Sequence, residues 1–140
     1  MIDETDRLII KALKENGRMM MKELGKSVHL TGQAAANRVM KLEEQGIIEG
    51  YTIKVNNAKI GKPIQAFLNI YTRGLEHKPL LDFFQNQDCI QNIYKISGEG
   101  CYMIEVFSSS HQELDTFLEE LSIYANYKVS IILNSLMDKL

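Results

Sequence analysis

Apolar residues recur at helical spacing in three short segments within the first 46 residues, which predicts three helices. Asp3 and Asp6 stand at the start of the first helix with the spacing of a capping pair, and Asn16-Gly17 ends it. The second helix is predicted over residues 20–28. The apolar positions of these two helices are Ile2, Ile9, Ile10 and Leu13, and then Met21, Leu24 and Val28.

The third predicted helix has two distinct faces. Thr31 is placed to cap its first turn, and Gly46 is placed to end it, because glycine adopts the left-handed conformation at low cost. Its apolar face consists of residues at i, i+4 and i+7: Ala35, Val39 and Leu42. Its opposite face is a polar stripe, flanked on one side by a cation: Gln33, Asn37 and Lys41, with Arg38 beside them.

Only two residues separate the second helix from the cap of the third. Two short helices joined by a tight turn form a helix-turn-helix, whose second helix enters the DNA major groove. Amide side chains can bond an adenine edge, arginine can bond a guanine edge, and lysine contacts phosphates. An ordinary solvated helix shows a similar stripe, so the preceding helix and the turn favour DNA. The candidate DNA-binding residues are Thr31, Gln33, Asn37, Arg38 and Lys41.

Residues 47–55 follow a different pattern. Glu49-Gly50 is a turn pair, and apolar residues then alternate with Thr52 and Lys54, which predicts a short, half-polar strand. Three helices and a strand pair would make a winged helix-turn-helix over residues 1–55. Residues 56–63 are polar, with a glycine and then Pro63, and are interpreted as a linker.

Residues 64–140 alternate between strand and helix patterns. Strands are predicted at 64–70, 90–96 and 101–107, and a fourth contains Val129, Ile131 and Leu133. Helices are predicted at 76–87 and from Ser110, which has capping-box spacing with Glu113, to Leu121. This order, β-α-β-β-α-β, is the ferredoxin-like arrangement, so the fold class is α+β. It leaves one sheet face without helices, which we expect a second copy to cover.

Several short motifs occur together in this chain. They are Asp3 and Asp6 in IDETDRLII, Asn16-Gly17-Arg18, Glu23-Leu24-Gly25, Leu30-Thr31, Arg38-Val39-Met40-Lys41-Leu42-Glu43 and Gly46-Ile47-Ile48. With this combination the chain resembles the leucine-responsive regulator/asparagine regulator (Lrp/AsnC) family of bacterial and archaeal transcription factors. The resemblance covers nearly the whole chain, and it implies a DNA-binding transcriptional regulator.

The C-terminal half resembles the regulation-of-amino-acid-metabolism (RAM) domain of that family. The resemblance implies dimers paired sheet to sheet, often assembled into octamers. It also implies amino-acid effectors bound between dimers, near the hairpin that joins the second and third strands. The residues that match this effector site are Gly98, Glu99, Cys101 and Tyr102.

Cys101 departs from the family pattern, which has a second acid at this position. A thiol is not an anion near neutral pH unless its pKa is lowered, so it does not replace a carboxylate that pairs with an amino group. Three alternatives follow: a different effector, substitution by Glu99, or no effector at all. The simplest interpretation of Cys101 itself is a small apolar residue at the start of a strand, and a redox pair with Cys89 is less favoured.

Charge is distributed unevenly along the chain. Residues 1–60 hold ten Lys/Arg and eight Asp/Glu, a net charge of +2, whereas the rest of the chain carries −4. The sign suits a DNA-binding N-terminal half, but a single module with so little excess charge should bind weakly and with strong salt dependence. Two domains of about 60 and 80 residues are also small for independent stability. We therefore expect a homo-oligomer, a dimer or an octamer, with several DNA-binding units held together.

The sequence shows few features of other protein classes. It has no apolar stretch of the length of a membrane span, no signal-peptide pattern and no disulfide framework, so a cytoplasmic, nucleoid-associated protein is expected. No cofactor, metal or catalytic motif is recognised. Three alternatives remain: a helix-turn-helix that binds protein, an enzyme on the ferredoxin-like superfold, and a nucleoid-architectural protein that wraps DNA without an effector.

Overall fold

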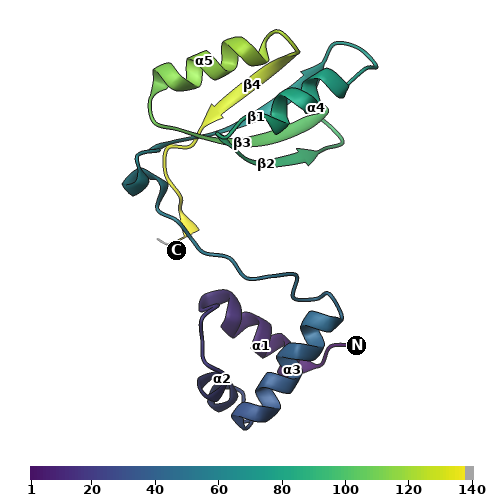
Figure 1. Ribbon diagram of the computed structural model, residues 1–140, viewed down its shortest axis with the longest axis vertical. Helices are drawn as coiled ribbons and strands as arrows, with labels where there is room; N and C mark the ends of the chain where they lie inside the picture. Colours follow the sequence, from purple (N-terminus) through teal and green to yellow (C-terminus); the bar gives the residue numbers. More distant parts are fainter. Residues whose placement is uncertain (138–140) are drawn as a thin grey trace. The chain divides into compact units, whose positions relative to one another are not determined.

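The computed structural model describes residues 1–137, and the chain forms two compact units, which divide between Val55 and Asn56 (Figure 1). The first unit contains three helices: α1 (Glu4–Glu15), α2 (Met21–Ser27) and α3 (Gly32–Glu44). The predicted apolar faces meet in a single core, which confirms the three-helix prediction. The buried residues of this core are Ile9, Leu24, Val28, Ala35, Val39 and Leu42.

Local hydrogen bonds define where these helices begin and end. The Asp6 amide donates to the Asp3 carboxylate at 2.8 Å and the Asp3 amide donates to the Asp6 carboxylate at 3.1 Å, which completes the predicted capping box. Thr31 Oγ1 accepts from the Ala34 amide at 3.0 Å and caps α3. Gly46, with φ +72°, turns the chain after α3. The carbonyl of Leu42 then accepts from the amides of residues 47 and 48.

Close packing at Gly25 keeps the turn between α2 and α3 tight. The Leu30 amide donates to the Gly25 carbonyl at 2.8 Å. A Cβ atom at position 25 would lie 2.6 Å from the Leu30 carbonyl oxygen and 2.8 Å from that of Thr31. A side chain at this position would therefore push the N-terminus of α3 away from α2.

The predicted wing strand is absent from the first unit. Residues 45–55 contain no strand, and Tyr51, Ile53 and Val55 are exposed at 53%, 77% and 44%. A strand forms only when its backbone pairs with a neighbouring strand, and in the described part of the chain residues 45–54 belong to no sheet. The alternation predicted the extended conformation, but the prediction of a strand here is wrong. The predicted linker is also partly regular, because a 3-10 helix, η1 (Asn57–Ile60), lies within it.

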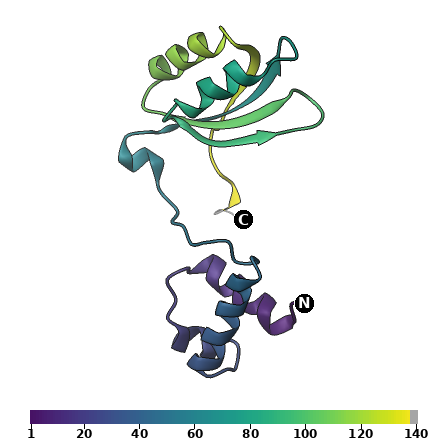
Figure 2. The ribbon, with the colours of Figure 1, turned by 45° about the vertical axis from the view of Figure 1, so that its right-hand side comes forward.

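The second unit is a four-stranded sheet with two helices. Its elements are β1 (Ile64–Thr72), α4 (Lys78–Gln85), β2 (Ile90–Lys95), β3 (Tyr102–Ser108), α5 (His111–Leu121) and β4 (Ala125–Ile131). The strand order is β2-β3-β1-β4 with every pair antiparallel. Both helices lie on one face of the sheet (Figure 2). The predicted β-α-β-β-α-β order is confirmed.

The fourth strand and the cap of α5 differ from the predictions. Strand β4 begins at Ala125, because its pairing with β1 already starts opposite Thr72, and it ends at Ile131, so the predicted strand residue Leu133 lies outside it. The Ser110 side chain caps α5 as predicted. However, the Glu113 carboxylate accepts from the amide and the hydroxyl of Ser109, one residue before the position that a capping box would use.

The two sheet faces have different environments. Alternate residues of β1 and β3 on the helix side are buried against α4 and α5 and form the core of this unit, for example Leu68 and Ile104, each 0% exposed. The other face holds partly exposed side chains, some apolar and some polar. Its residues on β1 and β3 are Gln65, Phe67, Asn69, Tyr71, Met103, Glu105 and Phe107. Within residues 1–137, no helix has the length and hydropathy that crossing a membrane requires.

Candidate nucleic-acid interface

The polar stripe of α3 is a solvent-facing surface of the first unit. Gln33, Asn37 and Lys41 are exposed, on the side opposite to the buried Ala35, Val39 and Leu42. Gln33 Nε2 donates to Asn37 Oδ1 at 3.0 Å, so these two amides form one hydrogen-bonded pair. Thr31, also exposed, begins the same helix. The stripe therefore presents donors, acceptors and a cation from one rigid helix.

Met40 belongs to the same surface, although the sequence patterns did not point to it. Its side chain is 56% exposed, and it lies three residues after Asn37 and seven after Gln33. Residues with this spacing share one face of a helix, so the spacing could have placed Met40 on the stripe. An exposed apolar side chain on a DNA-reading helix can contact the methyl group of thymine.

Arg38 has a different environment from the rest of the predicted set. Its Nη1 donates to both carboxylate oxygens of Asp3, at 2.6 and 2.8 Å, and to Asp6 Oδ1 at 3.2 Å. The Asp6 amide, followed by the Arg38 guanidinium, holds the pKa of Asp3 below its ordinary value, and the bonds to Asp3 and Asp6 raise the pKa of Arg38. Sequence reasoning missed this link, because the partners are more than 30 positions apart.

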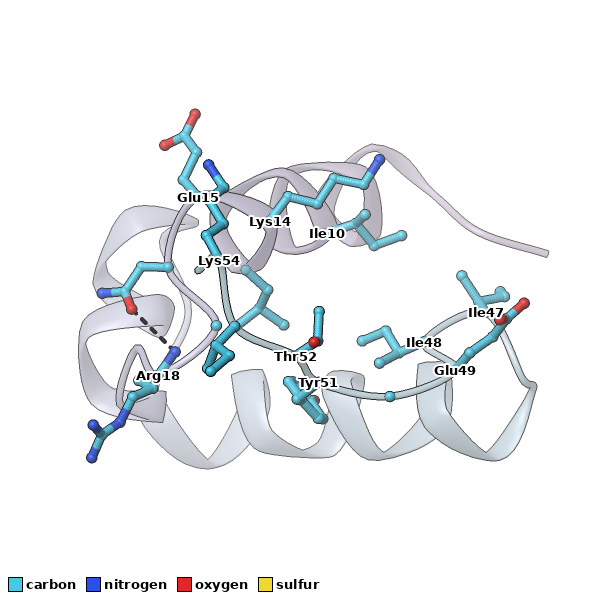
Figure 3. Close-up of a pocket in the computed structure, with 15 residues that line it drawn as sticks. Ile10, Lys14, Glu15, Arg18, Ile47, Ile48, Glu49, Tyr51, Thr52 and Lys54 are labelled. Carbon is cyan, nitrogen blue, oxygen red and sulfur yellow. Dashed lines mark hydrogen bonds between the residues drawn. The ribbon is translucent and has the colours of Figure 1, made fainter. Parts of the chain in front are cut away.

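An open hollow lies beside the extended segment that follows α3 (Figure 3). Its volume is about 730 Å³, and its walls come from the C-terminal half of α1, the turn after it and residues 47–54. Ile10, Leu13 and Ile48 supply apolar surface, and Lys14, Arg18 and Lys54 carry positive charge. The predicted DNA-binding residues of α3 do not line this hollow.

The hairpin loop between β2 and β3 carries the residues predicted for effector binding. Gly98 and Gly100 have φ values of +113° and +99°, and a Cβ at position 100 would lie 2.9 Å from the Ile70 carbonyl oxygen. Glu99 Oε1 accepts from the Tyr71 hydroxyl at 2.8 Å and from Lys128 Nζ at 2.7 Å. The Lys128 ammonium, followed by the Tyr71 hydroxyl, lowers the pKa of Glu99.

Cys101 lies against the end of β1. Its amide donates to the Ile70 carbonyl at 2.7 Å, and its Sγ is 3.2 Å from Thr72 Oγ1. The Thr72 hydroxyl lowers the pKa of this thiol, whereas burial raises that of Cys89. Tyr102 is only 7% exposed, and its hydroxyl lies 2.8 Å from His77 Nδ1 at the start of α4. The structure therefore separates the core side chain of Tyr102 from the exposed Glu99.

Among residues 1–137, no group of three or more His, Cys, Asp or Glu side chains is placed to hold a metal ion.

Comparison with known families agrees with both units. Residues 2–49 match the family described as winged helix-turn-helix DNA-binding, and residues 65–139 match the Lrp/AsnC ligand binding domain. The chain belongs to the Lrp/AsnC family. It is a DNA-binding transcriptional regulator of that family, and the family consists of regulators, not enzymes.

Relatives in the Lrp/AsnC family cover nearly the entire chain. The HTH-type transcriptional regulator LrpA of Bacillus subtilis is 50% identical over 134 residues, which are 95% of this chain and 98% of LrpA. LrpB of the same organism is 36% identical over 128 residues, which are 91% of this chain and 86% of LrpB. The structure of B. subtilis LrpC superposes with a TM-score of 0.90 at 29% identity, and 96% of each chain is covered. The Lrp/AsnC architecture predicted from the sequence is confirmed.

Proposed function

We propose that α3 is the recognition helix of this Lrp/AsnC regulator and that its polar stripe contacts DNA. The observation that carries this proposal is the exposed set of Gln33, Asn37 and Lys41 on one face of a helix whose other face is fully packed. The Gln33–Asn37 pair can bond base edges, Lys41 can contact a phosphate, and Thr31 begins the helix at the groove. Arg38 differs from these residues, because it already bonds two carboxylates.

Two or more copies of the chain act together in this proposal. The sheet face without helices carries Phe67, Met103 and Phe107, and a second copy of the same face would remove them from water. A dimer would present two α3 helices to half-sites about 34–36 Å apart, one turn of DNA. Pairing also raises the affinity of a module with a small positive charge, and octamers would raise it further. Such a regulator would act in the cytoplasm at the nucleoid.

Amino-acid modulation is proposed through the loop that holds Gly98, Glu99 and Cys101. A transcriptional regulator from Neisseria meningitidis, described as a complex with L-Met, has the same fold with a TM-score of 0.88 at 21% identity. That likeness supports the capacity of the fold for an amino acid. In this chain an effector amino group would have to compete with Lys128 and Tyr71 for the Glu99 carboxylate.

Effector-independent binding is the second candidate. The specific observation in its favour is that Lys128 and Tyr71 already bond Glu99, while Cys101 stands where the family pattern has a second acid. A protein of this kind would organise DNA by assembly alone, with little dependence on sequence.

The experiment that separates these functions is a titration with two labelled duplexes. One duplex covers the region upstream of the gene that encodes this chain, and the other is its scrambled counterpart. Both are titrated at two salt concentrations, with and without a panel of amino acids. Tight binding to the upstream duplex that one amino acid shifts would support the effector-responsive regulator. Equal, cooperative binding to both duplexes, unaffected by amino acids, would support the architectural role. No binding to either would contradict the recognition-helix proposal.

A further inference from the structure

Asp3, Asp6 and Arg38 join the first turn of α1 to the middle of α3. We propose that Arg38 is a positioning residue, which holds the recognition helix against α1 through the two carboxylates and does not itself contact DNA. The proposal rests on α3 being the helix that reads DNA. It assigns to the capping pair of α1 a role in DNA recognition as well as in starting that helix.

The carboxylates that receive Arg38 are also held by backbone hydrogen bonds. Each of the two aspartates already accepts a hydrogen bond from the backbone amide of the other, at 2.8 and 3.1 Å. The Arg38 guanidinium bonds the same pair from another helix at 2.6 to 3.2 Å. Charge-assisted hydrogen bonds of this length are among the stronger polar contacts in proteins. Within the described part of the first unit, the ion pairs joining two helices are those of Arg38.

The position of Arg38 on α3 explains why this link affects the reading surface. Successive residues of a helix are about 100° apart, so Arg38 lies at the flank of the stripe, about 60° around the helix from Lys41. A bond at this flank limits rotation of α3 about its axis relative to α1. Hydrogen bonds to base edges depend on direction, and a supporting contact that fixes the helix therefore preserves them.

The same geometry disfavours a direct phosphate contact by Arg38. Its side chain is 35% exposed, and the Asp3 carboxylate beside it is 57% exposed. A phosphate approaching the guanidinium would meet the repulsion of this negative charge. Lys41 is the α3 cation for which the structure records no ion pair among the described residues, and it is the better phosphate ligand.

Three variants of the full-length chain test the proposal: Asp3→Asn, Arg38→Lys and Arg38→Met. Asn caps a helix as well as Asp does, so Asp3→Asn removes the charge and keeps the cap of α1. Lysine retains the positive charge of Arg38 and can contact a phosphate, but its side chain is shorter and its ammonium is more strongly hydrated, so it is a poorer match for the two carboxylates that Arg38 Nη1 bonds. Folding of each variant is checked by circular dichroism and thermal melting.

Binding is measured by fluorescence anisotropy on a duplex selected from a random pool by the unaltered protein, and on a scrambled duplex. We expect Asp3→Asn to weaken binding to the selected duplex about fivefold or more, although it removes a negative charge near DNA. Arg38→Lys and Arg38→Met should lose affinity to a similar degree. Adding Asp3→Asn to Arg38→Met should cause little further loss, because both changes break one interaction. The slope of log affinity against log salt should stay unchanged.

Lys41→Gln and Asn37→Ala are the matched controls on the same helix. Lys41→Gln should reduce the salt slope by about 0.9, the value for one phosphate contact, and its effect should add to that of Asp3→Asn. If neither control variant changes DNA binding, the recognition-helix assignment itself fails, whatever the Arg38 variants do.

Four results would overturn the positioning role. Stronger binding by Asp3→Asn would mean that the aspartate restrains an arginine that contacts DNA. Full affinity in Arg38→Lys, or a salt slope lowered by about 0.9 in Arg38→Met, would identify a direct phosphate contact. Unchanged affinity in both Asp3→Asn and Arg38→Met would mean that the link has no part in recognition. If Arg38→Met does not fold, Asp3→Asn and Arg38→Lys still decide the question.

Discussion

Gln33 and Asn37 form the part of the α3 surface best suited to base recognition, because the 3.0 Å bond between them orients both side chains and leaves the Gln33 oxygen and the Asn37 amino group for a base edge. Asn37→Ala should reduce affinity for a selected duplex about 5- to 150-fold, the effect of losing about 1–3 kcal/mol of base discrimination. Affinity for a scrambled duplex should change much less. A cycle of Gln33→Ala, Asn37→Ala and the double variant, measured by anisotropy, checks whether the two amides act as a unit. Equal losses on both duplexes would contradict a reading role.

The Asp3 carboxylate gives the first unit a dependence on pH at the acidic end. Its pKa in the folded chain is lowered from 3.8, by the Asp6 amide and then by Arg38. A lowered folded-state pKa contributes stability that is present above the unfolded value and is lost as pH falls through the folded value. Melting temperature followed from about pH 6 to pH 2 should therefore fall less steeply for Asp3→Asn than for the unaltered chain. Parallel curves would show that this carboxylate has the same pKa in both states.

At the scale of elements, the separation of α2 and α3 depends on the glycine in α2. Gly25→Ala would place a Cβ 2.6 Å from the Leu30 carbonyl oxygen, so the helices must move apart. We expect a loss of more than about 1 kcal/mol in the free energy of unfolding, measured by urea titration. Gly50→Ala is the control, because nothing lies within 4 Å of its added Cβ. Equal stability of the two variants would contradict the role assigned to the close approach.

The helices could be predicted from the sequence because their patterns depend on nearby residues. The capping residues Asp3, Thr31 and Ser110 act within one turn, so periodicity and cap chemistry located the starts of α1, α3 and α5. The strand expected near Ile53 failed for the opposite reason, since a strand needs a pairing partner that local alternation does not supply. The prediction of the β-α-β-β-α-β order was right, because the four strands find their pairing partners within the second unit.

The candidate site was predictable only in part, for a related reason. The exposure of Gln33, Asn37 and Lys41 follows from helix geometry, and the structure agrees with it. The ion pairs of Arg38 with Asp3, and the bonds from Tyr71 and Lys128 to Glu99, join residues far apart in the chain. Such contacts depend on how elements pack, which the sequence does not show. From residue type alone, Arg38 was therefore predicted to contact DNA, and Glu99 was predicted to be available for a ligand.

At the scale of the whole molecule, the sheet face without helices is the surface on which oligomerisation can be tested. Phe67 on β1 and Phe107 on β3 belong to this face. The residues that alternate with them along each strand point to the other face and pack against α4 and α5. Polar side chains share the face, and the Glu105 carboxylate accepts from Gln65 Nε2 and Asn92 Nδ2 at 2.6 and 2.7 Å. A second copy can therefore bury aromatic area while the bonds among these polar groups remain satisfied.

Phe67→Lys should convert the assembly to a smaller species, because a copy of the same face would have to bury an unpaired ammonium. Ile123→Lys is the control, since Ile123 is 70% exposed and follows α5 in the chain. Sedimentation velocity should show a loss of mass for Phe67→Lys alone, with circular dichroism unchanged. Its affinity for an operator with two half-sites should then fall by about 10²- to 10⁴-fold, because avidity is lost while each α3 is intact. If Phe67→Lys keeps the mass of the unaltered chain, this face is not the dimer interface. Loss of mass with unchanged DNA affinity would mean that single copies of α3 suffice for binding.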